Sequence, residues 1–199
     1  DFCLSRGLGD VYKRQLEIKP EKAIKLEKDA LAQIENITAD NARLVSNLHA
    51  NLGGLYRMNG HPDLAREHME KSISLLDQFN LLHINDSIPQ IANYAMFLTE
   101  QQEPERGISE LQKLSGIIKE YHSDDCLDYA KVQETLGTIY LMTANLPQAK
   151  THFKRAFKIY EKIWADEPEM IEAKYQEIQE LYPQIGFCIG KNLSGLLTK

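Results

Sequence analysis

The segment Leu52-Gly53-Gly54-Leu55-Tyr56 recurs, slightly altered, as Leu136-Gly137-Thr138-Ile139-Tyr140. The two copies lie 84 residues apart, which is two steps of 42, and the intermediate step falls on Tyr94-Ala95-Met96-Phe97-Leu98. All three segments keep the order large, small, any, any, large. A fixed period of this length indicates a chain built from repeated structural units that stack on one another.

A second series of small residues and a series of prolines keep the same period. The small residues follow twelve positions later, at Ala65, Gly107 and Ala149. The prolines are Pro20, Pro62, Pro104 and, one residue out of step, Pro147. Proline is tolerated in the first turn of a helix, because the N–H that it lacks would have no partner there. Each repeat is therefore predicted to hold two helices, and the second begins at its proline.

Apolar residues within these segments recur at intervals of three and four, as at Leu44, Leu48, Leu52 and Leu55. That spacing is typical of one buried helical face, and no segment shows the sustained alternation of a strand. The predicted helices cover residues 20–36, 41–58, 62–80, 88–102, 104–121, 126–143, 147–165 and 169–182. Polar residues between the repeats, at 38–41, 85–87, 123–125 and 166–168, are expected to cap the helices that follow.

These residues carry a family resemblance. Leu-Gly-x-x-Tyr followed by Ala-x3-Met or Ala-x3-Phe resembles the tetratricopeptide repeat, a helix–turn–helix unit of about 34 residues. The longer period, with the run from Lys154 to Ile163 and the following Asp166-Glu167-Pro168, resembles the kinesin-light-chain type, in which both helices are extended. The resemblance covers residues 19 to about 183. It implies an all-α fold, a right-handed α-α superhelix of antiparallel helix pairs, and it indicates little about function.

The N-terminal segment Ser5–Gln15 resembles the translation of a sequencing-adapter oligonucleotide rather than a native basic loop. We therefore expect residues 1–15 to be non-native and residues 16–40 to form a partial repeat with its second helix only. Without a first helix, that repeat should leave its apolar residues partly exposed, namely Ile24, Leu31 and Ile34. Residues 41–183 are expected to hold three repeats plus a C-terminal helix, and residues 184–199 a tail or incomplete cap.

Composition excludes several classes of function. The 199 residues carry a net charge of −6, whereas a nucleic-acid-binding module typically has a basic surface. No apolar run approaches the ~20 residues of a membrane-spanning helix. The three cysteines are widely spaced, which favours a reducing, cytoplasmic compartment. Neither a metal-ligand spacing among the six histidines nor a catalytic triad is present, so we expect no metal, no cofactor and no enzymatic activity.

Residues of the first helices that do not belong to the packing pattern predict a binding face. The resemblance implies that they line the concave side of the array, where tetratricopeptide domains commonly bind extended peptides. The candidates are Asn47, Asn51, Gly54, Arg57, Asn93, Met96, Lys131, Thr135 and Thr138. The amides of Asn51 and Asn93 can bond to both the N–H and the C=O of a peptide main chain. Lys131 resembles a carboxylate-clamp lysine, but the other clamp cations are missing, which argues against recognition of a free C-terminal carboxylate.

Two hypotheses about function remain open. The first is a protein–protein interaction module, part of a larger protein, that binds a peptide or partner-protein segment on the concave face and neither nucleic acid nor membrane. The alternative is the sensor or regulatory arm of a bacterial signalling protein, an ATPase-type regulator or a kinase, whose catalytic domain lies elsewhere in the gene. A P-loop or kinase motifs upstream would distinguish the two.

Three further features receive structural interpretations. The Glu-rich stretch 167–180 is expected to be a solvated helix face rather than a set of paired carboxylates. His68 and His152, two periods apart, are expected to have a packing or surface role rather than to bind a metal. Trp164 is expected to pack at the end of a helix.

Overall fold

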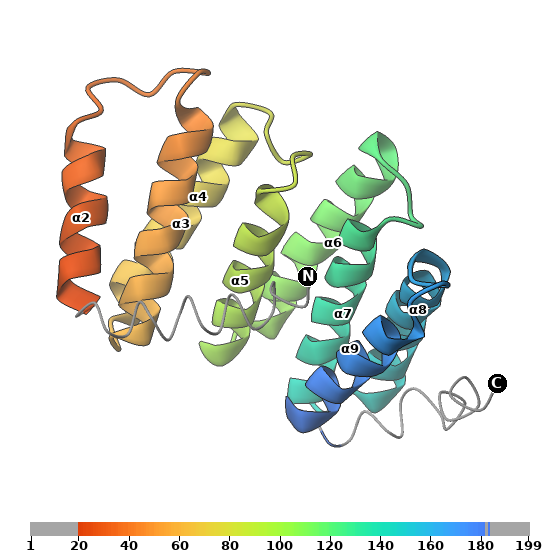
Figure 1. The fold of residues 1–199 in the computed structure, drawn as a ribbon. Coiled ribbons are helices and arrows are strands. Elements are labelled where there is room, and N and C mark those ends of the chain that lie inside the picture. The colour runs from red at the N-terminus through yellow and green to blue at the C-terminus, as the bar shows by residue number, and fades with distance from the viewer. Residues whose placement is uncertain (1–19, 182, 184–199) are drawn as a thin grey trace. The chain divides into compact units, whose positions relative to one another are not determined.

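The computed structural model describes residues 20–181 and residue 183, and the regular secondary structure of these residues is entirely helical (Figure 1). The helices are α2 (Pro20–Ala32), α3 (Ala42–Met58), α4 (Pro62–Gln78), α5 (Ser87–Glu100), α6 (Pro104–Tyr121), α7 (Leu127–Met142), α8 (Leu146–Ile163) and α9 (Pro168–Leu181). Their ends lie within two residues of the predicted ones, except at the end of α2. The all-α prediction is confirmed, whereas the expectations for residues 1–15 and 184–199 lie outside the described residues.

The chain divides into two compact units, Asp1–Leu81 and Leu82–Lys199, which we call unit 1 and unit 2. In unit 1, α3 pairs with α4, and α2 packs against α3. In unit 2, α5 pairs with α6 and α7 with α8, while α7 also contacts α5 and α6, and α9 contacts α8. Each pair consists of two consecutive helices joined by a short turn (Figure 1). The predicted assignment of a first and a second helix to each repeat is therefore confirmed.

Small residues bring the helices of each pair close together, as the sequence predicts. A Cβ on Gly53 of α3 would lie 2.6 Å from Met69 Cγ of α4. One on Gly137 of α7 would lie 2.9 Å from the ring of Phe153 on α8. Both helix pairs therefore depend on the missing side chain, because real Cβ atoms do not approach other heavy atoms so closely.

The prolines occupy the first turn of the second helices, as predicted. Pro62 and Pro104 begin α4 and α6, and Pro147 is the second residue of α8. Asn145 caps α8, because its side-chain oxygen accepts a hydrogen bond from the backbone N–H of Gln148 at 3.4 Å. At α7 the cap is Cys126, whose Sγ accepts from the N–H of Tyr129 at 3.4 Å.

The prediction that polar residues between the repeats cap the next helix is wrong at several positions. Asn41 precedes α3, but its Oδ1 accepts from the N–H of Thr38 at 2.8 Å and its Nδ2 donates to the carbonyl of Asn36 at 2.8 Å. Likewise, the hydroxyl of Ser123 accepts from the N–H of Asp125 at 3.1 Å. These side chains satisfy backbone groups of their own loops, which compete with helix capping.

Helix α2 has no buried residue. Ile24, Leu31 and Ile34 are half-buried, and Leu26 is 65% exposed. The helix ends four residues before the predicted position, at Ala32. The reason is a tight turn in which the N–H of Ile34 donates to the carbonyl of Leu31 at 3.1 Å, an i→i+3 bond that terminates the α-helical pattern.

Candidate functional site

The residues predicted to form the binding face fall into both units. Asn47, Asn51, Gly54 and Arg57 lie on α3 in unit 1. Unit 2 holds the other five, namely Asn93 and Met96 on α5 and Lys131, Thr135 and Thr138 on α7. Because α5 and α7 contact each other, the structure brings these five residues onto two neighbouring helices. We call them the α5–α7 face.

Within each helix of the α5–α7 face the side chains follow the spacing of one helical surface. Asn93 is exposed and Met96, three residues later, is half-buried. On α7, Lys131 is exposed, whereas Thr135 and Thr138 are half-buried. None of the five belongs to the buried core, so the face is available without disruption of the helix packing.

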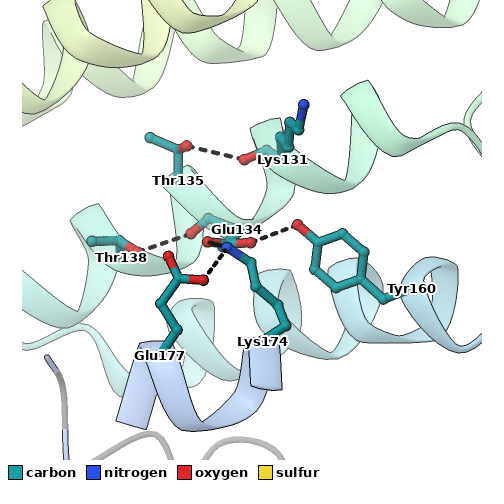
Figure 2. A network of polar contacts seen from close by, with 7 residues as sticks. All are labelled: Lys131, Glu134, Thr135, Thr138, Tyr160, Lys174 and Glu177. Atoms are coloured by element: carbon teal, nitrogen blue, oxygen red, sulfur yellow. Dashed lines mark hydrogen bonds and ion pairs between the residues drawn. The ribbon is translucent and has the colours of Figure 1, made fainter. Parts of the chain in front are cut away.

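The threonine hydroxyls of this face are already used as donors. Thr135 Oγ1 donates to the carbonyl of Lys131 at 3.0 Å, and Thr138 Oγ1 donates to that of Glu134 at 3.1 Å (Figure 2). A hydroxyl has one proton and two lone pairs. Each threonine therefore still accepts hydrogen bonds from a ligand but has no free proton to donate.

Lys131 supplies the positive charge of the face. Its Nζ lies 3.8 Å from Asp128 Oδ1, one turn earlier on α7, and its side chain is 55% exposed. An exposed pair at this distance contributes little to stability, so the ammonium can exchange this partner for a ligand carboxylate at little cost. In Figure 2 its side chain points away from the cluster around Glu134.

A polar cluster that the sequence analysis missed joins α7, α8 and α9. Lys174 Nζ of α9 lies 2.9 Å from Glu134 Oε1 of α7 and 3.2 Å from Glu177 Oε2 (Figure 2). The hydroxyl of Tyr160 on α8 donates to Glu134 Oε2 at 2.5 Å. The only sequence signal was the period, since Glu134 and Lys174 lie about one repeat apart and hence on neighbouring first helices.

The electrostatics of this cluster follow from burial and the two carboxylates. Burial alone would lower the pKa of Lys174, but Glu134 and Glu177 raise it above its ordinary value. The pKa of Tyr160 lies well above 10, because burial, first, and then the Glu134 carboxylate disfavour the phenolate. The ammonium and the neutral phenol are both stabilised, which makes the cluster a structural connection between helices.

The remaining glutamates of stretch 167–180 fit the expected solvated face. Glu167, Glu169 and Glu180 are exposed, and Glu172 Oε1 accepts from Gln176 Nε2 on the same helix at 2.7 Å. Paired carboxylates are not found among them.

In unit 1, Asn51 is already engaged by a neighbouring helix. Its Nδ2 donates to Glu27 Oε1 of α2 at 3.0 Å. Burial raises the pKa of Glu27, although the hydrogen bond from Asn51 acts in the opposite direction. Asn47, Gly54 and Arg57 are half-buried, and Asn47 and Arg57 interact with other groups of the chain. The α3 part of the predicted site is therefore less available to a ligand than the α5–α7 face.

The histidines and the tryptophan have the packing roles expected of them. His68 stacks on Tyr56 with ring centroids 5.4 Å apart, and His152 stacks on Tyr140 at 5.3 Å. Trp164, directly after α8, stacks on Tyr160 at 4.8 Å. In the described part of the chain, no group of three or more His, Cys, Asp or Glu side chains is placed to hold a metal ion. None of the described helices combines the length and the apolar character needed to cross a membrane.

Comparisons with known proteins agree with this geometry. Residues 87–162 match the tetratricopeptide repeat family. The chain resembles the crystal structure of BtubC (BKLC), a bacterial kinesin light chain from P. vanneervenii, with a TM-score of 0.70 and 20% sequence identity over 87% of this chain and 69% of that one. No curated protein matches the chain. Tetratricopeptide domains generally bind other proteins and are generally non-catalytic. The chain thus has the fold of a tetratricopeptide-repeat array, similar to that of the BtubC structure, and its residues 87–162 match the tetratricopeptide repeat family.

Proposed function

We propose that this chain is an interaction module of a larger protein and that it binds an extended segment of a partner protein along the α5–α7 face. The observation that carries the proposal is the exposed amide of Asn93 beside a neighbouring helix that presents Lys131 and two threonines. These side chains leave the core intact, and a repeat fold of this kind generally binds proteins.

The chemistry of the face selects the kind of segment. Asn93 offers an amide N–H and an amide oxygen, which match the C=O and N–H of one peptide unit in an extended chain. Thr135 and Thr138 have committed their protons, so they accept from backbone N–H groups of the ligand. Lys131 favours an acidic side chain at one end of the segment. Met96, which is half-buried, provides a small apolar contact between these polar groups.

The test is a binding measurement with a peptide selected on the full chain from a display library of extended peptides. Replacement of Asn93 by Ala should weaken binding about two- to tenfold, the effect of one or two lost hydrogen bonds, without a change in melting temperature. The matched control is Gln112→Ala, which removes an exposed amide from α6 and should leave affinity unchanged.

Asn51→Ala provides a second comparison. Because Asn51 bonds to Glu27, this variant should reduce the stability of unit 1 and leave the affinity of the α5–α7 face unchanged. If Asn93→Ala binds as tightly as Gln112→Ala, the partner docks elsewhere and the proposal is wrong. A lower melting temperature for Asn93→Ala would instead assign a structural role to that residue, which also contradicts the proposal.

A further inference from the structure

Two histidines face each other between the helices of the α3–α4 pair. His49 Nδ1 of α3 lies 2.8 Å from His68 Nδ1 of α4, and both side chains are half-buried. The ring centroids are 5.1 Å apart, so the rings meet head-on through these nitrogens. One nitrogen must carry a proton and the other must offer its lone pair, because two N–H groups or two lone pairs would repel each other.

The α7–α8 pair provides a natural comparison for this contact. Two periods later, the positions of His49 and His68 are occupied by Gln133 and His152. His152 Nδ1 lies 2.9 Å from Gln133 Oε1, and each histidine stacks on the tyrosine of its own repeat. The two sites therefore differ in the acceptor. An amide oxygen accepts from a neutral or a protonated imidazole, whereas an imidazole nitrogen accepts only while it is unprotonated.

We propose that the His49–His68 contact is an acid-sensitive connection between α3 and α4, which protonation of both rings breaks, while the Gln133–His152 contact of α7–α8 persists in acid. Once both Nδ1 atoms carry protons, two positive rings face each other with no acceptor between them. Unit 1 then opens more readily than unit 2 as pH falls. The pKa of His152 is lowered too, by burial and then by Arg155, so unit 2 also loses some stability in acid, but its contact keeps an acceptor. This response to acid does not depend on the binding of a partner.

Burial of both rings and the charged groups around His49 favour this direction. On α4, Lys71 disfavours a charged His49, and Glu67 acts against it. For His68, the larger charge effect is that of Glu67, which favours the charged ring, whereas Lys28 on α2 disfavours it. The Nζ of Lys28 lies 5.6 Å from the centroid of the Tyr56 ring on which His68 stacks. Burial is the largest effect on both histidines. Together with the charges of His68 and Lys71 it lowers the pKa of His49 from 6.5 to about 4.

Two other titratable groups of unit 1 contact residues of α3, His61 through Tyr56 and Glu27 through Asn51. His61, before α4, lies edge-on to Tyr56 with ring centroids 6.2 Å apart. Glu27 of α2 has a raised pKa and therefore contributes in the opposite direction, because its protonation stabilises the folded state as pH falls through that value.

Proton linkage determines whether the stability of unit 1 rises or falls as the pH is lowered. The folded pKa of His49 is below the unfolded value, so the unfolded state takes up more protons in acid. Its contribution to stability is complete above pH 6.5 and is lost as pH falls from there towards about 4. If the pKa of His49 shifts by the full amount, from 6.5 to about 4, the population of the open state rises about 20-fold between pH 7 and 5. Because the histidine pair is half-exposed, screening by solvent reduces this increase to roughly tenfold.

The experiment is hydrogen exchange of the full chain at pH 7, 6 and 5, corrected for the intrinsic pH dependence of exchange. Amides of α3 and α4 should lose roughly tenfold more protection than those of α7 and α8. His49→Gln installs the acceptor that the α7–α8 pair already has, and it should remove most of this difference. The converse variant, Gln133→His, should give α7 and α8 the same sensitivity to acid.

Equal losses of protection in the wild type and His49→Gln would overturn the proposal. A second measurement covers the case in which a variant fails to fold. The ring nitrogens of His49 and His68 in the wild-type chain are titrated by 15N NMR, and the proposal requires both rings to titrate below the ordinary value of 6.5. Titration of both rings near pH 6.5 with the contact intact would equally overturn it.

Discussion

At the scale of single residues, the close helix crossings explain an irregularity in the repeat. The outer pairs place glycine on the first helix and alanine on the second, as at Gly53 and Ala65. The middle pair reverses the order, with Ala95 on α5 and Gly107 on α6. In sequence this looks like a weakened motif. In the structure, the glycine that permits the close crossing lies on the second helix of this pair instead of the first. A Cβ on Gly107 would lie 2.6 Å from the carbonyl oxygen of Ala95.

This crossing leads to a prediction with a control on the same helix. Gly107→Ala should destabilise the protein by about 1–3 kcal/mol, because the new methyl group meets backbone atoms that cannot rotate away. Gly116→Ala, also on α6, meets no atom within 4 Å and should stabilise it by about 0.5–1 kcal/mol through helix propensity. Urea unfolding of both variants measures the two effects. A gain of stability in both variants would show that the crossing tolerates a methyl group.

At the scale of helices, the sequence predicts well where each helix lies in the chain, and predicts poorly which contacts the loop side chains make. The positions follow from the 42-residue period and from the three-four spacing of apolar residues, which depend only on each helix burying one face. The prediction that loop side chains such as Asn41 cap the next helix was wrong. The side-chain oxygen can accept either from an N–H of the helix or from an N–H of the loop within a few residues, and in Asn41 it accepts from the loop.

The same limit applies to the candidate site. The period placed Asn93, Lys131 and the threonines on neighbouring first helices. It could not show that Asn51 bonds to Glu27, or that Lys174 reaches Glu134, because such contacts depend on side-chain directions between helices. Long-range polar pairs therefore had to come from the structure.

The connection between α7, α8 and α9 predicts a loss of stability in alkaline solution. The pKa of Tyr160 is raised well above 10 in the fold, so its contribution is complete below pH 10 and is lost as pH rises above that value. Lys174, whose pKa is also raised, contributes in the same direction. Tyr160→Phe should cost about 1–3 kcal/mol at pH 8, the value of a hydrogen bond to a carboxylate, and should reduce the further loss above pH 10.

Urea unfolding at pH 8 and pH 10.5 measures both effects. Tyr129→Phe is a suitable control, since Tyr129 is also a buried tyrosine of unit 2. If Tyr160→Phe loses as much stability between the two pH values as the wild type does, Tyr160 is not the group that titrates.

At the scale of the whole molecule, the two compact units place equivalent crossings in separate parts of the chain. Gly53 lies in unit 1 and Gly137 in unit 2. In repeat arrays each unit is stabilised by its own packing and by its immediate neighbours, so damage remains largely local. The array should therefore show regional stabilities rather than a single cooperative one.

A pair of leucine substitutions tests this regional behaviour. Gly53→Leu overfills the crossing against Met69, and Gly137→Leu overfills the one against Phe153. We expect Gly53→Leu to accelerate hydrogen exchange of residues 42–78 at least tenfold and to leave residues 104–163 within about twofold of the wild type, since overpacking costs about 1–3 kcal/mol or more. Gly137→Leu should reverse the two regions. Exchange that accelerates equally throughout the chain in either variant would mean that the two units unfold together, because damage to one crossing would then have removed the stability of both.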